Sequence, residues 1–129
     1  MTDGKILIVD DEPDNREILK IHLKSMGYPI LEAAQGAQAM EFLRSDHFKQ
    51  EIGLVFCDIR MPECNGIEVL DYFSQEAPWI PMVMLSGYPD RELESSLLKK
   101  GAKKFLVKPV EKQNLLNIAE KYFEIKKEI

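Results

Sequence analysis

Residues 54–62, with the sequence Leu-Val-Phe-Cys-Asp-Ile-Arg-Met-Pro, constrain the fold of this chain more than any other stretch. Four consecutive apolar residues, 54–57, are typical of a short strand that is buried on both faces of a parallel sheet. Asp58 then lies at the carboxyl end of this strand, where open α/β sheets hold their ligands. Because burial makes an isolated charge costly, a carboxylate there needs a metal ion, a cation or a chemical role.

The rest of the chain continues an alternation of short apolar runs and segments with helical periodicity. Further strands are predicted at residues 5–9, 30–33, 82–85 and 105–107. Helices are predicted between Asp14 and Gly27, over residues 36–44 and 67–76, between Asp90 and Gly101, and from about Glu111 onwards. The first helix is expected to place its apolar residues at helical spacing on one face: Ile18, Leu19, Leu23 and Met26. The polar segment 45–51 is expected to be an irregular connection.

Five strands that alternate with five helices predict an α/β fold, a parallel sheet with helices on both faces. Because crossovers between parallel strands are right-handed, few topologies remain. The flavodoxin-like (βα)5 arrangement with strand order 2-1-3-4-5 is favoured. The chain shows no internal repeat and no linker, so residues 1–129 are predicted to form a single domain.

Composition and charge exclude several other classes of protein. The formal net charge of -5 argues against nonspecific binding to nucleic acid. No apolar stretch approaches the roughly 20 residues of a membrane span, and the N-terminal apolar run is too short for a signal peptide. Cys57 and Cys64 match neither a disulfide framework nor a zinc pattern. Reduced thiols fit a cytoplasmic protein.

Polar residues follow four of the five predicted strands. Asp10 and Asp11 follow the first strand, Asp58 the third, Ser86 the fourth and Lys108 the fifth. These strand ends share one edge of a parallel sheet, so the five side chains are expected to converge there. Three carboxylates repel one another unless a hard divalent cation lies between them. Oxygen ligands and few protein contacts favour Mg²⁺, with Mn²⁺ as an alternative.

The residue types at this edge predict chemistry at phosphorus. An ionised Asp58 can attack phosphorus and form an aspartyl phosphate, and it needs no general base because it is already deprotonated at neutral pH. Lys108 and Ser86 can bind phosphoryl oxygens that a metal ion leaves free. Taken singly, each residue has an ordinary alternative role as a helix cap, a loop residue or a surface lysine. Their coincidence at strand ends favours a site for a phosphoryl group.

The motifs at the strand ends resemble those of the receiver domain of two-component response regulators. They are Val9-Asp10-Asp11-Glu12, Asp58-Ile-Arg-Met-Pro62 with Gly66, Leu85-Ser86-Gly87 and Lys108-Pro109. The resemblance covers essentially the whole chain. It implies that Asp58 accepts a phosphoryl group from a sensor histidine kinase or a histidine phosphotransfer protein. Such a domain is a signalling module that catalyses its own phosphorylation and slow self-dephosphorylation, rather than an enzyme acting on another substrate.

The resemblance also implies a set of metal ligands. Asp11, Asp58 and the backbone carbonyl of Arg60 would ligate the magnesium ion, and Asp10 would support it through water. The peptide bond between Lys108 and Pro109 would be cis, a form that proline makes accessible.

A switch and an access route follow from the same resemblance. The hydroxyl of Ser86 would move toward the phosphoryl group and the ring of Phe105 would turn inward, although Phe105 is alternatively a plain core residue. The face formed by the last two helices and the strand between them would then change and control a partner. Arg60 and Tyr88, each two residues beyond a site residue, are expected to control water access and the lifetime of the acyl phosphate.

The main alternative from another class is a scaffold with the same fold that acts without phosphorylation. An aspartate-nucleophile phosphatase would carry a second acid where Arg60 stands, and a flavin carrier would carry a hydroxyl- and glycine-rich loop after the first strand. The output is expected to be a downstream protein or a fused output domain, with no direct contact to nucleic acid or membrane by this segment. An apolar seam predicts that the last helix packs on the sheet or continues into a coiled-coil linker of a monomer or phosphorylation-linked homodimer: Leu115, Ile118, Tyr122, Ile125 and Ile129.

Overall fold

The structure, a computed structural model, describes residues 4–127, and in the last helix it describes side chains as far as Tyr122. Its strands are β1 (Lys5–Val9), β2 (Ile30–Ala33), β3 (Ile52–Asp58), β4 (Met82–Ser86) and β5 (Lys104–Val107). Its helices are α1 (Pro13–Lys24), α2 (Gly36–Phe42), α3 (Asp46–Glu51), α4 (Gly66–Glu76), α5 (Arg91–Lys99) and α6 (Lys112–Lys127). Every strand pairing is parallel and the order is β2-β1-β3-β4-β5, which confirms the predicted topology.

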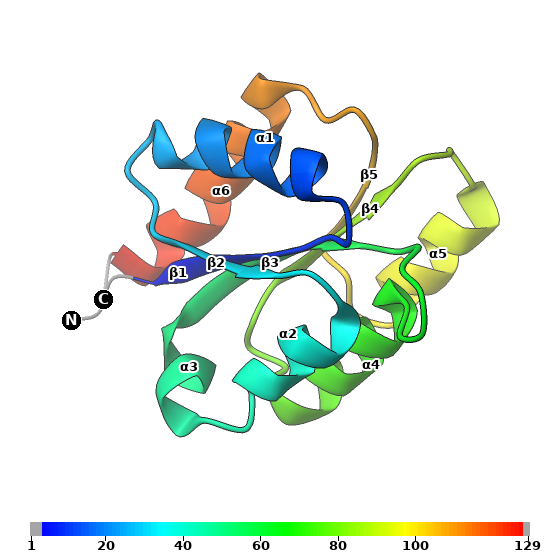
Figure 1. The fold of residues 1–129 in the computed structure, drawn as a ribbon, viewed down its shortest axis with the longest axis horizontal. Coiled ribbons are helices and arrows are strands. Elements are labelled where there is room, and N and C mark those ends of the chain that lie inside the picture. Colours follow the sequence, from blue (N-terminus) through cyan, green and yellow to red (C-terminus); the bar gives the residue numbers. More distant parts are fainter. Residues whose placement is uncertain (1–3, 128–129) are drawn as a thin grey trace.

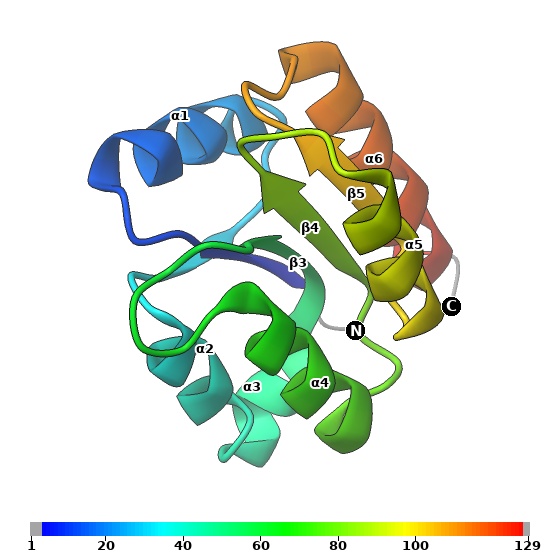
Figure 2. The same cartoon turned by 90° about the vertical axis from the view of Figure 1, so that its right-hand side faces the viewer.

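Helices cover both faces of the sheet (Figure 1). Helices α1 and α6 lie on one face, whereas α2, α3, α4 and α5 lie on the other (Figure 2). Neighbouring residues of β1 alternate between the two cores: Ile6 and Ile8 face α1 and α6, and Leu7 and Val9 face the opposite layer. Strand β3, in the middle of the sheet, is buried along its whole length. Burial on both faces explains its uninterrupted apolar sequence.

The structure corrects the prediction of an irregular connection at residues 45–51. Asp46–Glu51 forms α3, so the described residues contain six helices rather than five. Only Phe48 of this short helix packs against the core, where its ring meets Phe42 edge to face with the ring centroids 5.1 Å apart. One apolar contact in six residues gives no periodic pattern, which is why the sequence did not predict this helix.

The first helix also differs from its predicted outline. It starts at Pro13 rather than Asp14, and no side chain caps its first turn. Leu19 and Leu23 are buried as expected, but Ile18 and Met26 are 52% and 53% exposed. Ile18 lies about 100° around the helix from its buried neighbour, and Met26 lies beyond the last helical turn.

The last helix packs on the sheet through its first turns. Leu115 and Ile118 are buried, and Tyr122 packs against the same core. The side chain of Ile125 and the whole of Ile129 lie outside the described residues, so the continuation of the seam stays a prediction. Within residues 4–127, no helix combines the length and the hydropathy that crossing a membrane requires.

Helix α4 is anchored directly behind Asp58. The amide of Gly66 donates to the carbonyl oxygen of Ile59 at 2.8 Å, and a Cβ at Gly66 would lie 2.3 Å from the carbonyl oxygen of Asp58. Only glycine allows this close approach. Asn65 caps the helix: its side chain accepts from the amide of Glu68 at 3.0 Å, and the Glu68 side chain accepts from the Asn65 amide at 3.1 Å.

Replacing Asn65 with alanine is expected to lower the free energy of unfolding by about 1 kcal/mol, because the amide of Glu68 loses the side-chain acceptor that caps the first turn of α4. Asn65→Asp keeps the acceptor and is expected to unfold close to the wild type. Urea unfolding followed by circular dichroism measures the difference. Equal stability of Asn65→Ala and the wild type would contradict the assigned cap.

Candidate functional site

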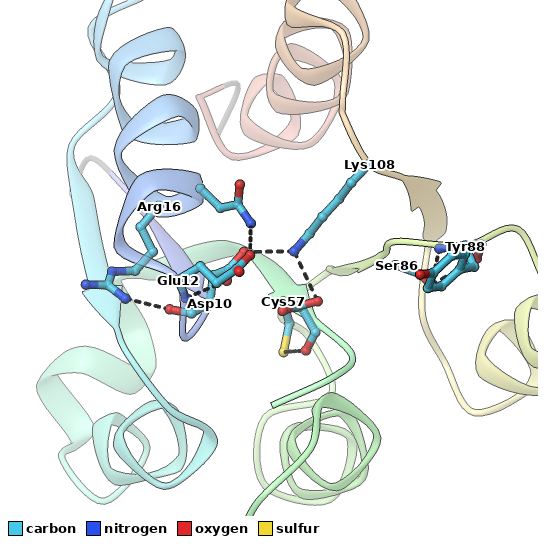
Figure 3. A network of polar contacts seen from close by, with 9 residues as sticks. Asp10, Glu12, Arg16, Cys57, Ser86, Tyr88 and Lys108 are labelled. Atoms are coloured by element: carbon cyan, nitrogen blue, oxygen red, sulfur yellow. Dashed lines mark hydrogen bonds and ion pairs between the residues drawn. The ribbon is translucent and has the colours of Figure 1, made fainter. Parts of the chain in front are cut away.

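Asp10 follows β1 and is fully buried. Its carboxylate accepts a hydrogen bond from the amide of Glu12 at 2.9 Å and another from Nζ of Lys108 at 3.0 Å. Its amide donates to the carbonyl oxygen of Ala33 on β2 at 3.1 Å. Its own carbonyl accepts from Nη1 of Arg16 at 2.7 Å (Figure 3). The amide, the carbonyl oxygen and both carboxylate oxygens of Asp10 therefore each have a hydrogen-bond partner.

Asp58, the last residue of β3, shares Lys108 with Asp10. The Lys108 Nζ lies 3.2 Å from Oδ1 of Asp58, so one ammonium group pairs with two carboxylates. Burial raises the pKa of the Asp58 carboxyl, Lys108 opposes that shift, and the charge of Asp10 adds to it. Burial acts to lower the pKa of Lys108, but the two carboxylates outweigh it and raise this pKa. The lysine is therefore a firmly protonated cation between two acids.

Three carboxylates meet at the ends of β1 and β3. Oxygen atoms of Asp10, Asp11 and Asp58 all lie within 4.8 Å of one another. This oxygen-only donor set fits a hard divalent cation such as Mg²⁺. Asp11 is the partly exposed member, and among residues 4–127 no hydrogen bond or ion pair holds its carboxylate. The backbone carbonyl of Arg60 is a predicted further ligand.

Ser86 ends β4 at the same edge but does not contact the acids in this structure. Its Oγ donates to the carbonyl oxygen of Tyr88 at 3.0 Å and accepts from the Tyr88 amide at 3.2 Å (Figure 3). Tyr88 is 65% exposed, and the guanidinium carbon of Arg60 lies 5.4 Å from the centroid of its ring. Arg60 and Tyr88, the two residues predicted to control access of water, therefore contact each other.

The remaining predicted site residues lie on β5 or directly after it. The Lys108–Pro109 peptide bond is cis. Phe105 is half-buried on the edge strand and packs against the core on the α2–α5 side of the sheet. An open cavity of about 360 Å³ adjoins the site, and its lining includes Asp10 and Lys108 together with Asn15, Leu85 and Gly87.

Sequence reasoning missed Arg16. This residue lies on α1, and its guanidinium reaches both the end of β1 and Glu32 on β2, with Nε 3.3 Å from Oε1. The one available signal was its place four residues after Glu12, which puts it on the same side of the helix as the preceding loop. That signal does not distinguish it from any charged residue on an exposed helix face.

Comparisons with known proteins agree with this geometry. The profile of the response regulator receiver domain matches residues 6–120. The transcriptional regulatory protein ZraR of Escherichia coli (strain K12) is 37% identical over 116 residues, which cover 90% of this chain and 25% of that protein. The chain spans about a quarter of the length of ZraR and of the response regulator protein PilR of Pseudomonas aeruginosa.

Solved structures give the same result. The receiver domain of NtrX from Brucella abortus is 31% identical with a TM-score of 0.83, and the match covers 93% of this chain and 98% of that chain. The CheX–CheY–BeF3–Mg complex from Borrelia burgdorferi includes a chain that is 30% identical with a TM-score of 0.84, covering 93% and 89% of the two chains. Fold, family profile and relatives concur, and this chain belongs to the receiver domain family of two-component response regulators.

Proposed function

We propose that this receiver domain accepts a phosphoryl group on Asp58 from the phosphohistidine of a sensor histidine kinase or a histidine phosphotransfer protein. One observation carries the proposal: the carboxylates of Asp10, Asp11 and Asp58 meet at one strand edge, and Lys108 pairs with two of them. Asp58, the nucleophile, therefore lies beside the ammonium group of Lys108 and beside carboxylate oxygens that suit a metal ion. This is the arrangement that phosphoryl transfer to a carboxylate needs.

The transfer is a displacement at phosphorus. A carboxylate oxygen of Asp58 forms a bond to phosphorus while the bond from phosphorus to the imidazole nitrogen breaks, and the departing imidazole keeps the electron pair. Lys108, which lies 3.2 Å from Oδ1 of Asp58, is placed to neutralise a phosphoryl oxygen attached to that carboxylate. Asp11, Asp58 and the Arg60 carbonyl would hold a Mg²⁺ ion, and Asp10 would support it through water. The ion would supply further positive charge for the phosphoryl oxygens.

Ser86 and Phe105 are the proposed switch. The Ser86 hydroxyl now donates within its own loop, and transfer of that hydrogen bond to a phosphoryl oxygen would free the carbonyl of Tyr88. A Cβ at Gly87 would have no atom within 4 Å, so the loop has room to move. The half-buried ring of Phe105 can then turn inward, which would alter the surface formed by α5, β5 and α6.

The comparisons support the cofactor and the partners of this proposal. The Borrelia complex contains BeF3 and magnesium with its CheY chain, which is consistent with a magnesium site here. ZraR is a transcriptional regulatory protein of which this chain matches a quarter, so the switched surface is proposed to act on a fused output domain or a downstream protein. Two free cysteines fit a place in the cytoplasm, where a kinase would donate the phosphoryl group.

Incubation with acetyl phosphate tests the proposal directly. Intact mass spectrometry is expected to show the gain of one phosphoryl group in the presence of magnesium and none in the presence of a chelator. Autophosphorylation from this small donor needs no partner, so the result depends on the domain alone. No gain under conditions that modify another receiver domain would contradict the proposal and favour the phosphorylation-independent scaffold.

The contact between Arg60 and Tyr88 gives a prediction about phosphate lifetime. Arg60→Ala and Tyr88→Ala are each expected to shorten the lifetime of the acyl phosphate about two- to fivefold, the factor that corresponds to losing an exposed cation–π contact of about 0.5–1 kcal/mol. Loss of the cover would let water approach the phosphoryl group more often. Decay of the phosphorylated mass after removal of the donor measures this lifetime.

Arg91→Ala is the matched control for this prediction, because Arg91 is an exposed arginine that starts α5. It is expected to leave the lifetime unchanged. Unchanged lifetimes in both Arg60→Ala and Tyr88→Ala would show that the pair does not limit access of water.

A further inference from the structure

Arg16 joins three secondary-structure elements beside the acidic cluster. Its Nη1 donates to the carbonyl oxygen of Asp10 at 2.7 Å, and its Nε lies 3.3 Å from Oε1 of Glu32. The Arg16 side chain is 17% exposed, and the guanidinium is rigid and planar. Two contacts through different nitrogen atoms therefore fix both its position and its orientation.

Glu32 provides the other end of this contact. Its Oε2 accepts from Nζ of Lys20 at 3.0 Å, and Lys20 also pairs with Glu17 at 3.1 Å. Lys20, as the largest cause, and Arg16 lower the pKa of the Glu32 carboxyl below its ordinary value, although burial acts to raise it. Glu32 is thus an anion that pairs with both Lys20 and Arg16. Of these two cations, Arg16 is the one that also contacts Asp10.

The contact to Asp10 bears on Asp11 through the peptide bond between them. The six atoms of a peptide unit are coplanar, so holding the carbonyl oxygen of Asp10 also sets the position of the Cα of Asp11. Asp10 and Asp58 have further contacts with Lys108, but within the described part of the chain nothing holds the Asp11 carboxylate. The location of this acid therefore depends on its backbone.

We propose that Arg16 is a positioning residue for the metal site: it orients the Asp10–Asp11 peptide and so places the Asp11 carboxylate against Asp10 and Asp58. This inference rests on the proposed function of the acidic cluster as a magnesium site. Arg16 does not touch the ion itself. It acts as residues that orient metal ligands do, and loss of such residues commonly weakens metal binding about 10- to 100-fold.

The sign of the effect separates positioning from simple electrostatics. A positive charge near a cation site repels the cation, so removing Arg16 would strengthen magnesium binding if only its charge mattered. Removing a residue that positions Asp11 would weaken binding instead. The two roles predict changes in opposite directions, and one titration decides between them.

The test is a titration of ¹⁵N-labelled protein with MgCl2, followed by two-dimensional NMR of the backbone amides. This readout needs no phosphoryl donor and no activity, and the dispersion of the spectrum reports whether each variant is folded. We expect Arg16→Gln to bind Mg²⁺ about tenfold more weakly than the wild type. Arg16→Lys keeps the charge but lacks the planar fork, and its affinity is expected to be intermediate.

Lys20→Gln is the matched control, because it removes a cation from the same glutamate without touching Asp10. Its Mg²⁺ affinity is expected to stay within about twofold of the wild type, since charge effects at the surface are small. Equal or tighter binding by Arg16→Gln would overturn the inference. If Arg16→Gln does not fold, Arg16→Lys decides, and wild-type affinity of that variant overturns the inference. Absence of binding in the wild type would contradict the proposed function itself.

Discussion

Asp58→Asn is expected to gain no phosphoryl group from acetyl phosphate and magnesium, whereas the wild type gains one. The amide has nearly the shape of the carboxylate but carries no charge and is not a nucleophile toward phosphorus. Among the three acids, Asp58 is the one at the end of the central strand β3, where it is buried and forms an ion pair with Lys108. Intact mass spectrometry of both proteins in one experiment measures the difference.

Asp14→Asn is the matched control for this substitution. Asp14 lies in the first turn of α1, is exposed, and has the same side chain without a place in the cluster. Its phosphorylation is expected to equal that of the wild type. A phosphoryl group on Asp58→Asn would show that another carboxylate, such as Asp10 or Asp11, accepts it.

Asp58→Asn is also expected to be more stable than the wild type at neutral pH when a chelator removes metal ions. The pKa of the Asp58 carboxyl is raised, chiefly by burial, so the folded protein binds this proton more tightly than the unfolded chain does. Its contribution to stability is therefore lost as the pH rises from the ordinary carboxyl range through the raised pKa. Asp58→Asn lacks this loss, and urea unfolding at several pH values is expected to show a difference that grows with pH.

The sheet, and the meeting of polar residues at one edge of it, could be predicted because short-range patterns mark the strands and their ends. β3 is buried on both faces, so its sequence 54–57 is apolar throughout and its end is marked by the first charged residue. Parallel topology then brings the residues at the ends of β3 and β4 and just after β1 and β5 to one edge, without any knowledge of side-chain contacts. The identity of the converging residues follows from these two facts.

Contacts that depend on rotamers and on distant partners could not be predicted. The bond from Arg16 to the carbonyl of Asp10 depends on the packing of α1 against β2, where Glu32 holds the other side of the guanidinium. The hydrogen bonds of Ser86 with Tyr88 depend on the conformation of one loop. Neither the direction of a long side chain nor the rotamer of a hydroxyl has a periodic signature in the sequence.

Within the described residues, Lys108 is the cation that pairs with the two buried carboxylates of the site. Lys108 is 21% exposed and pairs with Asp10, which is fully buried, and with Asp58. A bound divalent cation would supply the positive charge that Lys108 now shares between the two acids. Lys108 therefore has two roles in this proposal, because it stabilises the metal-free fold and also binds a phosphoryl oxygen.

Lys108→Met separates these two roles. In a chelator at neutral pH, its free energy of unfolding is expected to fall by about 1–3 kcal/mol, because two buried carboxylates lose a charged hydrogen-bond donor. Saturating magnesium is expected to restore much of that loss, since the ion can replace the missing charge. The rate of phosphorylation from acetyl phosphate is expected to stay about a hundredfold below that of the wild type even with magnesium, because the phosphoryl group loses a charged donor.

Lys104→Met provides the control, because Lys104 is an exposed lysine at the start of β5, the strand that Lys108 follows, and is expected to change neither stability nor rate. Urea unfolding with chelator and with magnesium gives the stabilities, and the time course of the mass gain gives the rate. If magnesium restored the rate along with the stability, Lys108 would serve only to balance the acids. A rate that stays low in a restabilised protein would assign the ammonium group to the phosphoryl-transfer step, since at that point the fold and the metal site are intact and only this contact is missing.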